Sequence, residues 1–242
     1  MYRLQNIDAL EGLKQLEDES VDIIITSPPY NKAGLNGICK GAKWNKTVDY
    51  GGDINIDNRP EEEYQKWQLD ILNECYRVLK KDGMMFYNHK NRIVRGKGYI
   101  ISPYSWLLKT PFLIRQEIIW NRKSGCNTDP SRFVPIFESI YVLCKTKDVC
   151  FYRNKEADFK TDIWTINPDK KNNHPAPFPI DIPRNILSCI TKEKAIVLDP
   201  FNGSGTTGVA AIERGFNYIG FDIIDEYLQE TERKIEKNIK MA

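Results

Sequence analysis

Short apolar runs alternate with amphipathic stretches along this chain. Two of the apolar runs, Val21–Thr26 and Ala195–Leu198, are bounded by turn-forming residues, which is typical of strands buried on both faces of a sheet. Apolar residues recur at helical spacing in Glu61–Leu79 and in Thr206–Arg214. Because strands and helices alternate in this way, the sequence predicts an α/β fold.

The same pattern predicts further elements on both sides of these runs. Strands are expected at Tyr2–Ile7, Met84–Tyr87, Arg115–Trp120, Ser139–Cys144 and Asn217–Phe221. Helices are expected around Leu10–Leu16 and at Ser105–Thr110, Ile180–Ile190 and Asp225–Ile239.

Two segments lack periodicity and are interpreted as insertions. Residues 31–60 are rich in Gly, Asn, Lys and Asp, and residues 145–173 are polar and irregular. Loops of such length in a compact domain are usually functional or mobile. We therefore expect one domain spanning residues 1–242, with a long loop at 31–60 and a short recognition segment at 145–173.

Composition restricts the class of protein. Of the 242 residues, 41% are hydrophobic, which is enough for one globular core. The six cysteines are scattered without a C-x-x-C pair, and there are only two histidines. We therefore expect no metal site and reduced, mostly buried thiols, as in a cytosolic protein. No apolar stretch is long enough to span a bilayer, and no signal-like segment precedes the first predicted strand.

The charge distribution is more informative than the net charge of +2. The stretch Gly83–Gln116 contains no acidic residue and interleaves aromatic residues with basic ones. Its basic residues are Lys90, Arg92, Arg95, Lys97, Lys109 and Arg115. Such a stretch suits contacts with phosphates. A solvated basic face is the alternative interpretation.

The run Val21–Thr26 ends abruptly in Ser27-Pro28-Pro29-Tyr30. Neither proline can donate a backbone hydrogen bond, so the strand stops there. Ligands of open α/β sheets bind at the carboxyl ends of strands. The hydroxyl, the stiff carbonyls and the aromatic ring are therefore candidate site groups. Taken alone, the tetrapeptide is also compatible with an ordinary turn.

A glycine-rich turn follows the run Ala195–Leu198. Gly203, Gly205 and Gly208 match G-x-G-x-x-G between a predicted strand and a predicted helix. Asp222 lies about 20 residues further on, at the end of the next strand, where an acidic side chain of a dinucleotide fold accepts hydrogen bonds from ribose hydroxyls. A nicotinamide-dependent oxidoreductase is one function that this pattern permits.

Too few elements follow the glycine turn to complete a dinucleotide-binding half. The N-terminal strand can supply the missing one, because it ends in Asp8 and is followed by a helix. If the motif order is circularly permuted, the sheet would run from the glycine turn through Asp222 to Asp8 and on to Ser27. Their side chains would then lie along one carboxyl edge.

In this order, T-S-P-P-Y and D-P-F-N-G-S-G-T-T resemble the motifs of the beta group of DNA amino-methyltransferases. These enzymes use S-adenosylmethionine to methylate N4 of cytosine or N6 of adenine. The likeness covers nearly the whole chain, since residues 120–122, 137–141, 162–164 and 174–179 also resemble segments of the family. It implies a Rossmann-like mixed seven-stranded sheet, permuted motif order and small inserted recognition segments.

The resemblance also implies roles for single residues. Ser27 and the carbonyl of Pro28 would accept hydrogen bonds from the target amino group, Pro29 would stiffen the turn, and Tyr30 would stack on the flipped base. Asp222 would hold the ribose of the cofactor, and Asp8 its adenine amino group. The other candidates for cofactor binding are Asp199, Phe201, Gly203, Ser204, Gly205 and Thr206.

Several alternatives remain open at the level of sequence. Ser27 favours cytosine N4, because adenine enzymes of the family more often carry D-P-P-Y, and adenine N6 is the alternative. No cysteine follows a proline, so the Pro-Cys of cytosine C5 enzymes is absent. His174 is interpreted as a loop residue rather than a base. A catalytically idle DNA-binding subunit is a further alternative. DNA is the expected partner, a cognate restriction endonuclease an open one, and the chain would be a monomer or homodimer in the cytoplasm.

Overall fold

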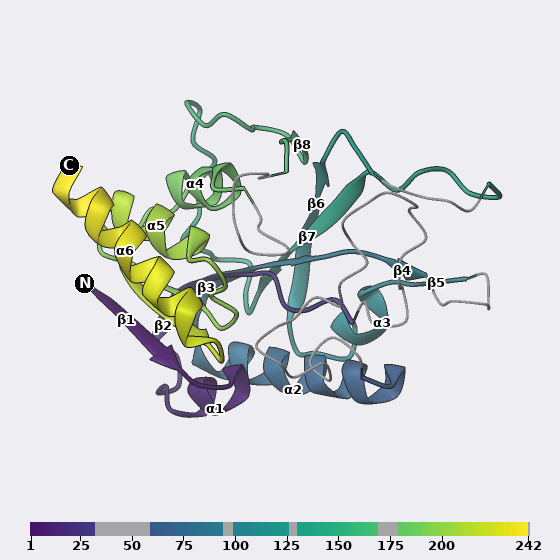
Figure 1. The fold of residues 1–242 in the computed structure, drawn as a ribbon, viewed down its shortest axis with the longest axis horizontal. Coiled ribbons are helices and arrows are strands. Elements are labelled where there is room, and N and C mark those ends of the chain that lie inside the picture. Colours follow the sequence, from purple (N-terminus) through teal and green to yellow (C-terminus); the bar gives the residue numbers. More distant parts are fainter. Residues whose placement is uncertain (32–58, 94–98, 126–129, 169–178, 242) are drawn as a thin grey trace.

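The computed structural model describes residues 1–31, 59–93, 99–125, 130–168 and 179–241 (Figure 1). Within these residues the main sheet has eight strands in the order β1-β10-β9-β2-β3-β7-β6-β8, and a small sheet pairs β4 with β5. The strands are β1 (Tyr2–Asn6), β2 (Val21–Thr26), β3 (Leu79–His89), β4 (Arg92–Ile93), β5 (Ile100–Ile101), β6 (Leu113–Asn121), β7 (Phe137–Cys144), β8 (Ile163–Thr165), β9 (Ile196–Asp199) and β10 (Asn217–Asp222). The helices are α1 (Ala9–Lys14), α2 (Glu61–Val78), α3 (Tyr104–Leu107), α4 (Asp181–Ser188), α5 (Thr206–Glu213) and α6 (Asp225–Met241).

The main sheet is mixed, which confirms the predicted Rossmann-like α/β fold. Strands β1, β10, β9, β2 and β3 are parallel, whereas β7 runs antiparallel to both β3 and β6. The sheet has one strand more than the seven predicted. This additional strand is the short β8, which lies within the segment predicted to be irregular and pairs with β6. Trp164 of β8 is buried, so this part of residues 145–173 belongs to the core.

The sequence predicts that the N-terminal strand lies next to the strand that ends before Ser27, and this prediction is wrong. Strand β2 pairs with β9, through Ile23↔Val197 and Ile24↔Leu198, and not with β1. Strand β1 pairs with β10 and lies at the edge of the sheet. The physical reason is burial: all six residues of β2 are buried, whereas β1 is only partly buried. A fully buried strand needs neighbours on both sides, and a partly exposed one suits an edge.

Helices cover both faces of the sheet (Figure 1). On one face, α4, α5 and α6 contribute Ile186, Val209 and Ile235 to one apolar cluster. On the other face, α1, α2 and α3 contribute Leu13, Leu72 and Leu107 to a second one. The carboxyl ends of the parallel strands therefore emerge between two helical layers, which is where ligands of such sheets bind.

Strand β3 is longer than predicted. The sequence predicts helical spacing as far as Leu79 and a strand only from Met84, but β3 begins at Leu79, directly after α2. At Gly83 the chain passes so close to β2 that a Cβ would lie 2.7 Å from the Asp22 carbonyl oxygen. Glycine thus allows the close approach of two strands here, rather than ending a helix.

The basic residues of the stretch differ in burial: among those that the structure describes, Arg92 is buried, Lys90 is half-buried, and Lys109 and Arg115 are exposed. Arg92 is 6% exposed, and its guanidinium binds the Glu61 carboxylate through two hydrogen bonds of 2.6 and 2.7 Å. The same group lies 4.5 Å from the centre of the Tyr64 ring and 5.5 Å from that of Trp106. The prediction that Arg92 contacts phosphate is therefore wrong. Arg95 and Lys97 lie outside the described residues.

Other expectations can be compared with the described residues only. None of the described helices is both long and apolar enough to cross a membrane. Within the same part of the chain, no group of three or more His, Cys, Asp or Glu side chains could hold a metal ion. Four cysteines lie there as buried free thiols, as predicted: Cys75, Cys144, Cys150 and Cys189. Cys39, Cys126 and His174 lie outside the described residues.

Candidate active site

The two sequence motifs meet because their strands are neighbours. Ser27 follows β2, and the glycine turn follows β9, at the same carboxyl edge of the sheet. The Thr26 hydroxyl donates a 2.8 Å hydrogen bond to Oδ1 of Asp199, which also accepts a 3.0 Å bond from the backbone N–H of Phe201. Asp199 is 2% exposed, and burial raises the pKa of its carboxyl to about 6. This carboxyl group therefore joins the ends of both strands.

The glycine turn has a left-handed backbone. Gly203 has a φ of 49° and Gly205 a φ of 78°, values that favour glycine. A Cβ on Gly205 would also collide with the side chain of Thr231 on α6. Gly205 is the N-cap of α5, which begins at Thr206. The turn thus connects the end of β9 to the start of α5 within a few residues.

A buried network holds this turn from inside the fold. The Asn202 side-chain N–H group donates to the Gly203 carbonyl at 2.8 Å and to the Thr231 hydroxyl at 2.9 Å. The Tyr218 hydroxyl donates to Oδ1 of Asn202 at 2.8 Å. The sequence pattern did not predict Asn202, Tyr218 and Thr231 as residues that form the site. Only the asparagine within the glycine-rich turn offered a local signal for them.

Asp222 lies at the end of β10, beside the glycine turn. Its Oδ2 accepts a 2.7 Å hydrogen bond from the backbone N–H of Gly203, and its Oδ1 accepts a 3.0 Å bond from that of Ile224. Burial raises the pKa of this carboxyl, although both backbone donors act in the opposite direction. The side chain is half-buried, and each oxygen has a further lone pair, so it can also accept hydrogen bonds from the hydroxyls of a sugar.

Asp8 lies on the same edge of the sheet as Asp222. The amide of the preceding residue, Ile7, donates a 3.0 Å hydrogen bond to the Asp222 carbonyl. It is the N-cap of α1, and its Oδ1 accepts from the Leu10 and Glu11 amides at 2.8 and 3.4 Å. Its side chain is exposed. Strands β10 and β9 separate Asp8 from Ser27, so the structure places Asp8 next to Asp222 rather than beside the tetrapeptide.

The other predicted cofactor residues gather around the turn. Phe201 packs edge-on against Trp67 of α2, with 5.6 Å between ring centres. Ser204 is buried, and its carbonyl accepts a 2.8 Å hydrogen bond from Lys234 of α6. Thr206 is half-buried at the first turn of α5. The structure thus brings these residues together at the ends of β9 and β10.

The tetrapeptide is held rigidly. Pro28 is buried, and the Pro29 carbonyl accepts a 2.7 Å hydrogen bond from the Tyr64 hydroxyl of α2. Among the described residues, no donor reaches the Pro28 carbonyl. Ser27 is half-buried. The Ser27 hydroxyl is therefore a partly exposed polar group, and the Pro28 carbonyl keeps its capacity to accept hydrogen bonds.

Tyr30 is 6% exposed and its hydroxyl lies in a polar network. This hydroxyl lies 2.8 Å from Oγ of Ser27, donates a 3.0 Å hydrogen bond to Oε2 of Glu138, and accepts a 2.6 Å bond from Nδ2 of Asn88. Burial raises the pKa of Tyr30 well above its ordinary value, and the charge of Glu138 adds to this effect. The phenol therefore stays protonated. Its ring lies 4.6 Å from the His89 ring.

Asn88 and Glu138 are site residues that the sequence analysis missed. Asn88 lies at the end of β3, and Glu138 at the start of the antiparallel strand β7, so both reach the same edge. Glu138 is 6% exposed and accepts a 3.0 Å hydrogen bond from Arg122, just beyond β6. The one available signal was a carboxylate within an otherwise apolar strand pattern.

The predicted loop at 31–60 is described only at its ends. Asn31 and Arg59 are joined by two hydrogen bonds: Nδ2 of Asn31 donates to the Arg59 carbonyl at 2.9 Å, and the Arg59 amide donates to Oδ1 of Asn31 at 2.8 Å. The Arg59 guanidinium lies 4.9 Å from the centre of the Trp67 ring. Asn31 and Arg59 therefore lie together, next to the tetrapeptide in sequence.

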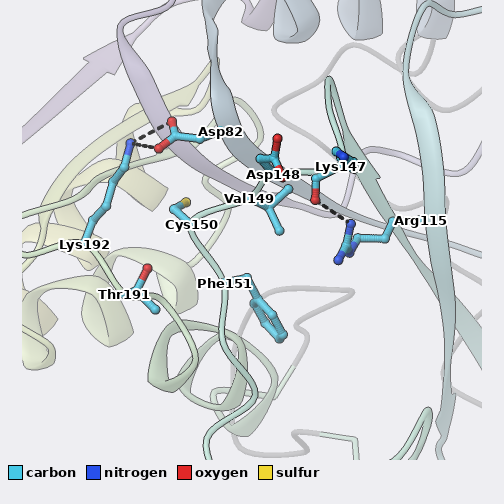
Figure 2. A pocket seen from close by; sticks show the side chains of 9 residues that line it. All are labelled: Asp82, Arg115, Lys147, Asp148, Val149, Cys150, Phe151, Thr191 and Lys192. Carbon is cyan, nitrogen blue, oxygen red and sulfur yellow. Dashed lines mark hydrogen bonds and ion pairs between the residues drawn. The ribbon is translucent and has the colours of Figure 1, made fainter.

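A depression of about 630 Å³ lies at the opposite edge of the sheet (Figure 2). It includes Asp82 near the start of β3 and Arg115 near the start of β6. Two of its cations have partners: Lys192 binds Asp82 at 2.8 Å, and Arg115 donates to the Lys147 carbonyl at 3.1 Å. Figure 2 shows both pairs. Because it lies away from the strand ends that carry the motifs, this depression is not the candidate active site.

Comparisons with known proteins agree with this geometry. The model of the N6/N4 methyltransferase family, described as DNA methylase, matches residues 21–233. The type II methyltransferase M.BglII of Bacillus subtilis is 29% identical and aligns over 94% of this chain and 67% of its own length. The DNA adenine methyltransferase YhdJ of Escherichia coli (strain K12) is 27% identical over 95% of this chain and 81% of its own.

Solved structures share the fold. The PvuII DNA methyltransferase, described as cytosine-N4-specific, superimposes with a TM-score of 0.76 and 20% identity over 99% of this chain and 90% of its own. TTHA0409 from Thermus thermophilus, solved in complex with S-adenosyl-L-methionine, gives a TM-score of 0.71 and 21% identity over 98% of this chain and 94% of its own. With the family match over most of its length, this chain belongs to the N6/N4 family of DNA amino-methyltransferases.

Proposed function

We propose that this chain transfers a methyl group from S-adenosylmethionine to N4 of a flipped cytosine in DNA. The observation that supports this most directly is the junction of the two motifs. The Thr26–Asp199 hydrogen bond of 2.8 Å joins the strand that ends in Ser27 to the strand that enters the glycine turn. A methyl donor held at the turn would therefore lie next to the tetrapeptide.

The residues around the glycine turn fit the methyl donor. S-adenosylmethionine supplies a methyl group on a positively charged sulfur. Asp222 retains acceptor capacity for the two ribose hydroxyls, and Asp8 lies beyond it for the adenine amino group. The methionine end is assigned to the turn and its flanks: Asp199, Phe201, Gly203, Ser204, Gly205 and Thr206. These assignments are proposals that rest on position and chemistry.

The tetrapeptide supplies acceptors for the target amino group. Its nitrogen is a poor nucleophile because the lone pair is delocalised into the base. Oγ of Ser27 and the Pro28 carbonyl are assigned to accept its two N–H groups, which favours a pyramidal nitrogen facing the methyl group. Positioning of this kind lowers a barrier by about 7–11 kcal/mol at best. The Tyr64–Pro29 hydrogen bond keeps the turn rigid, so little entropy is lost.

The target base has to leave the duplex before it reaches this edge. Flipping costs a few kcal/mol in lost stacking and pairing. Tyr30 is assigned to face the flipped base, with Lys90 5.7 Å from the centre of its ring. Since the Tyr30 hydroxyl is fixed by Glu138 and Asn88, its ring is pre-oriented for such a contact.

The choice of base rests on Ser27. Serine at this position favours cytosine N4 by family resemblance, and adenine N6 is the alternative. Similar proteins include both kinds, since YhdJ is described as an adenine methyltransferase and the PvuII enzyme as cytosine-N4-specific. Sequencing of modified bases in DNA from cells that express this chain tests the choice. We expect N4-methylcytosine within one short sequence, whereas N6-methyladenine there would support the alternative.

The remaining assignments follow from the class of enzyme. The type II relatives suggest a cognate restriction endonuclease as partner, and we propose a single methyltransferase domain acting as a monomer or homodimer on cytoplasmic DNA. The family match weighs against the nicotinamide-dependent alternative. An idle subunit is less favoured, because the tetrapeptide and the glycine turn are both present. Binding of S-adenosylmethionine without methyl transfer to any DNA would revive it.

A further inference from the structure

A continuous chain of hydrogen bonds leads from the proposed reaction centre into the protein. It runs from Oγ of Ser27 to the Tyr30 hydroxyl over 2.8 Å, and from there to Oε2 of Glu138 over 3.0 Å. The Glu138 side chain is 8% exposed. A buried carboxylate connected to the residue that would bind the target amino group requires an explanation beyond packing, because burying a charge is costly.

Three hydrogen-bond donors surround the Glu138 carboxyl group. Tyr30, Asn88 and Arg122 all donate to it, at 3.0, 3.1 and 3.0 Å. A carboxylate with three donors needs no proton of its own. Arg122, which is 23% exposed, supplies the opposite charge.

Proton counting then fixes the direction of the chain. The Tyr30 phenol has one proton, and Glu138 can only accept, so Tyr30 donates to Glu138. Oγ of Ser27 lies within hydrogen-bond distance of the same phenol oxygen and therefore has to donate its proton to it. Nδ2 of Asn88 also lies within hydrogen-bond distance of the phenol oxygen at 2.6 Å, of Glu138 at 3.1 Å and of Oγ of Ser27 at 3.3 Å, and has two protons to donate among them. The Ser27 oxygen is thereby left as an acceptor, which is what an N–H group of the target requires.

We propose that Glu138 is the terminal acceptor of the proton that the target amino group loses, and that Ser27 and Tyr30 conduct it. This deepens the proposed function and rests on it. The new N–C bond forms from the nitrogen lone pair, and the C–S bond breaks with its electron pair going to sulfur. The nitrogen then passes one proton to Ser27, as Ser27 passes its own to Tyr30 and Tyr30 passes its own to Glu138.

The charges balance along this path. Before reaction, the site holds a positive charge on the methyl donor, a positive charge on Arg122 and a negative charge on Glu138. Afterwards the sulfur and Glu138 are neutral, Arg122 keeps its charge, and the hydroxyls of Ser27 and Tyr30 each carry one proton again. Since the site is largely buried, removing a pair of charges in the same reaction avoids leaving a positive nitrogen without a partner.

Two variants interrupt the chain at different points. Glu138→Gln keeps the size and an acceptor oxygen but cannot take up a proton, and Tyr30→Phe keeps the ring but removes the connecting hydroxyl. We expect each to lower the single-turnover rate of methyl transfer by about 100-fold or more, the range typical of a lost proton acceptor. Affinities for S-adenosylmethionine and DNA should stay within about threefold of those of the unmodified protein, since a proton-transfer step contributes little to binding.

The chain offers a matched control pair. The Tyr104 hydroxyl donates a 3.0 Å hydrogen bond to Glu117 of β6, outside the path from Ser27. Glu117→Gln and Tyr104→Phe make the same chemical changes there and should leave the rate unchanged. Glu138→Asp restores a carboxylate one methylene shorter and should recover part of the rate.

The pH dependence separates proton transfer from a positioning role. In Glu138→Gln the proton of the target amino group has to be taken up by hydroxide. The methyl-transfer rate of this variant should therefore rise with pH above neutrality, whereas the rate of the unmodified protein should stay constant. Loss of positioning alone would lower the rate equally at every pH. The other groups that face Glu138 or the Tyr30 ring are Arg122, Asn88, His89 and Lys90, all retained in this variant.

The outcomes are distinct. An unmodified protein that transfers no methyl group to DNA overturns the proposed function, and this inference with it. An active protein whose Glu138→Gln variant keeps the rate, or loses it equally at every pH, overturns the inference alone. If Glu138→Gln fails to fold, Tyr30→Phe decides, because it breaks the same path while the Glu138 carboxyl group and its ion pair with Arg122 remain.

Discussion

The Thr26 hydroxyl donates a 2.8 Å hydrogen bond to the Asp199 carboxyl group, and so joins the last residue of β2 to the last residue of β9. The Phe201 amide donates to the same carboxyl oxygen at 3.0 Å. Asp199 thus connects the strand that ends in the tetrapeptide to the turn that leads into α5. The cost is a buried acid whose pKa is raised to about 6.

This raised pKa predicts a pH dependence of stability. Folding makes Asp199 harder to ionise, so the folded protein holds more protons than the unfolded one between the ordinary value of 3.8 and about 6. The contribution of this group is fully present below 3.8 and is lost as pH rises through that window. Its size is on the order of 3 kcal/mol.

Asp199→Asn keeps the acceptor oxygen but cannot ionise. The stability of this variant should therefore lack the pH-dependent contribution of Asp199. Urea unfolding of both proteins at pH values across the window measures the difference. We expect Asp199→Asn to gain stability relative to the unmodified protein as pH rises. A difference that stays constant with pH would contradict the assignment.

Asp222→Ala should weaken binding of S-adenosylmethionine by about 10–100-fold, the effect of losing one or two hydrogen bonds to a charged acceptor. The same change leaves the Gly203 amide without its 2.7 Å partner, which loosens the turn. Calorimetric titration measures the affinity. Asp222→Asn retains one acceptor oxygen and should be intermediate, while unchanged affinity in Asp222→Ala would exclude Asp222 from the cofactor site.

Gly205→Ala should destabilise the fold by more than Gly215→Ala. Both glycines have a left-handed φ, 78° and 76°, but a Cβ on Gly205 collides with Thr231, whereas nothing lies within 4 Å of one on Gly215. Gly215→Ala therefore isolates the backbone cost of about 1–2 kcal/mol, and the difference measures the collision. If Gly205→Ala and Gly215→Ala lose equal unfolding free energy, α6 moves at Thr231 to make room for the added Cβ. Gly205→Ala combined with Thr231→Ala should recover part of the difference.

Arg92→Ala should act on stability rather than on DNA binding. Removing this buried cation breaks its bidentate pair with Glu61 and should cost about 3 kcal/mol. A residue that contacts phosphate would instead reduce the salt dependence of DNA binding by about one unit of slope. Lys109, which is exposed, is the surface control and should change stability by less than about 0.5 kcal/mol. A reduced salt slope with unchanged stability in Arg92→Ala would reverse this interpretation.

The sequence predicts most of the fold because its signals are local. Buried runs such as Val21–Thr26, and helical spacing such as that of Glu61–Leu79, depend on neighbouring residues only. Strand order depends on pairing between distant segments, and there the prediction failed, placing β1 next to β2. Partial exposure of β1 is the property that distinguishes an edge strand, and its polar residues Arg3, Gln5 and Asn6 were the available signal.

The candidate site divides in the same way. The tetrapeptide and the glycine turn are continuous in sequence and could be identified directly. Asn88 reaches the site through the parallel pairing of β3 with β2, and Glu138 through the antiparallel register of β7 with β3, which pairs His89 with Ser139. Arg92 shows the reverse error, because a basic residue was expected at the surface while its partner Glu61 lies far away in sequence.

The most direct test is transfer of tritiated methyl groups from S-adenosylmethionine to duplex DNA, followed by separation of the nucleosides. The account predicts label in N4-methylcytosine with the unmodified protein. Ser27→Ala should lose most of this label while it binds S-adenosylmethionine with unchanged affinity, because the proposed function assigns Ser27 to the target base and not to the cofactor. Label at C5 of cytosine, or in no nucleoside of DNA, would contradict the account.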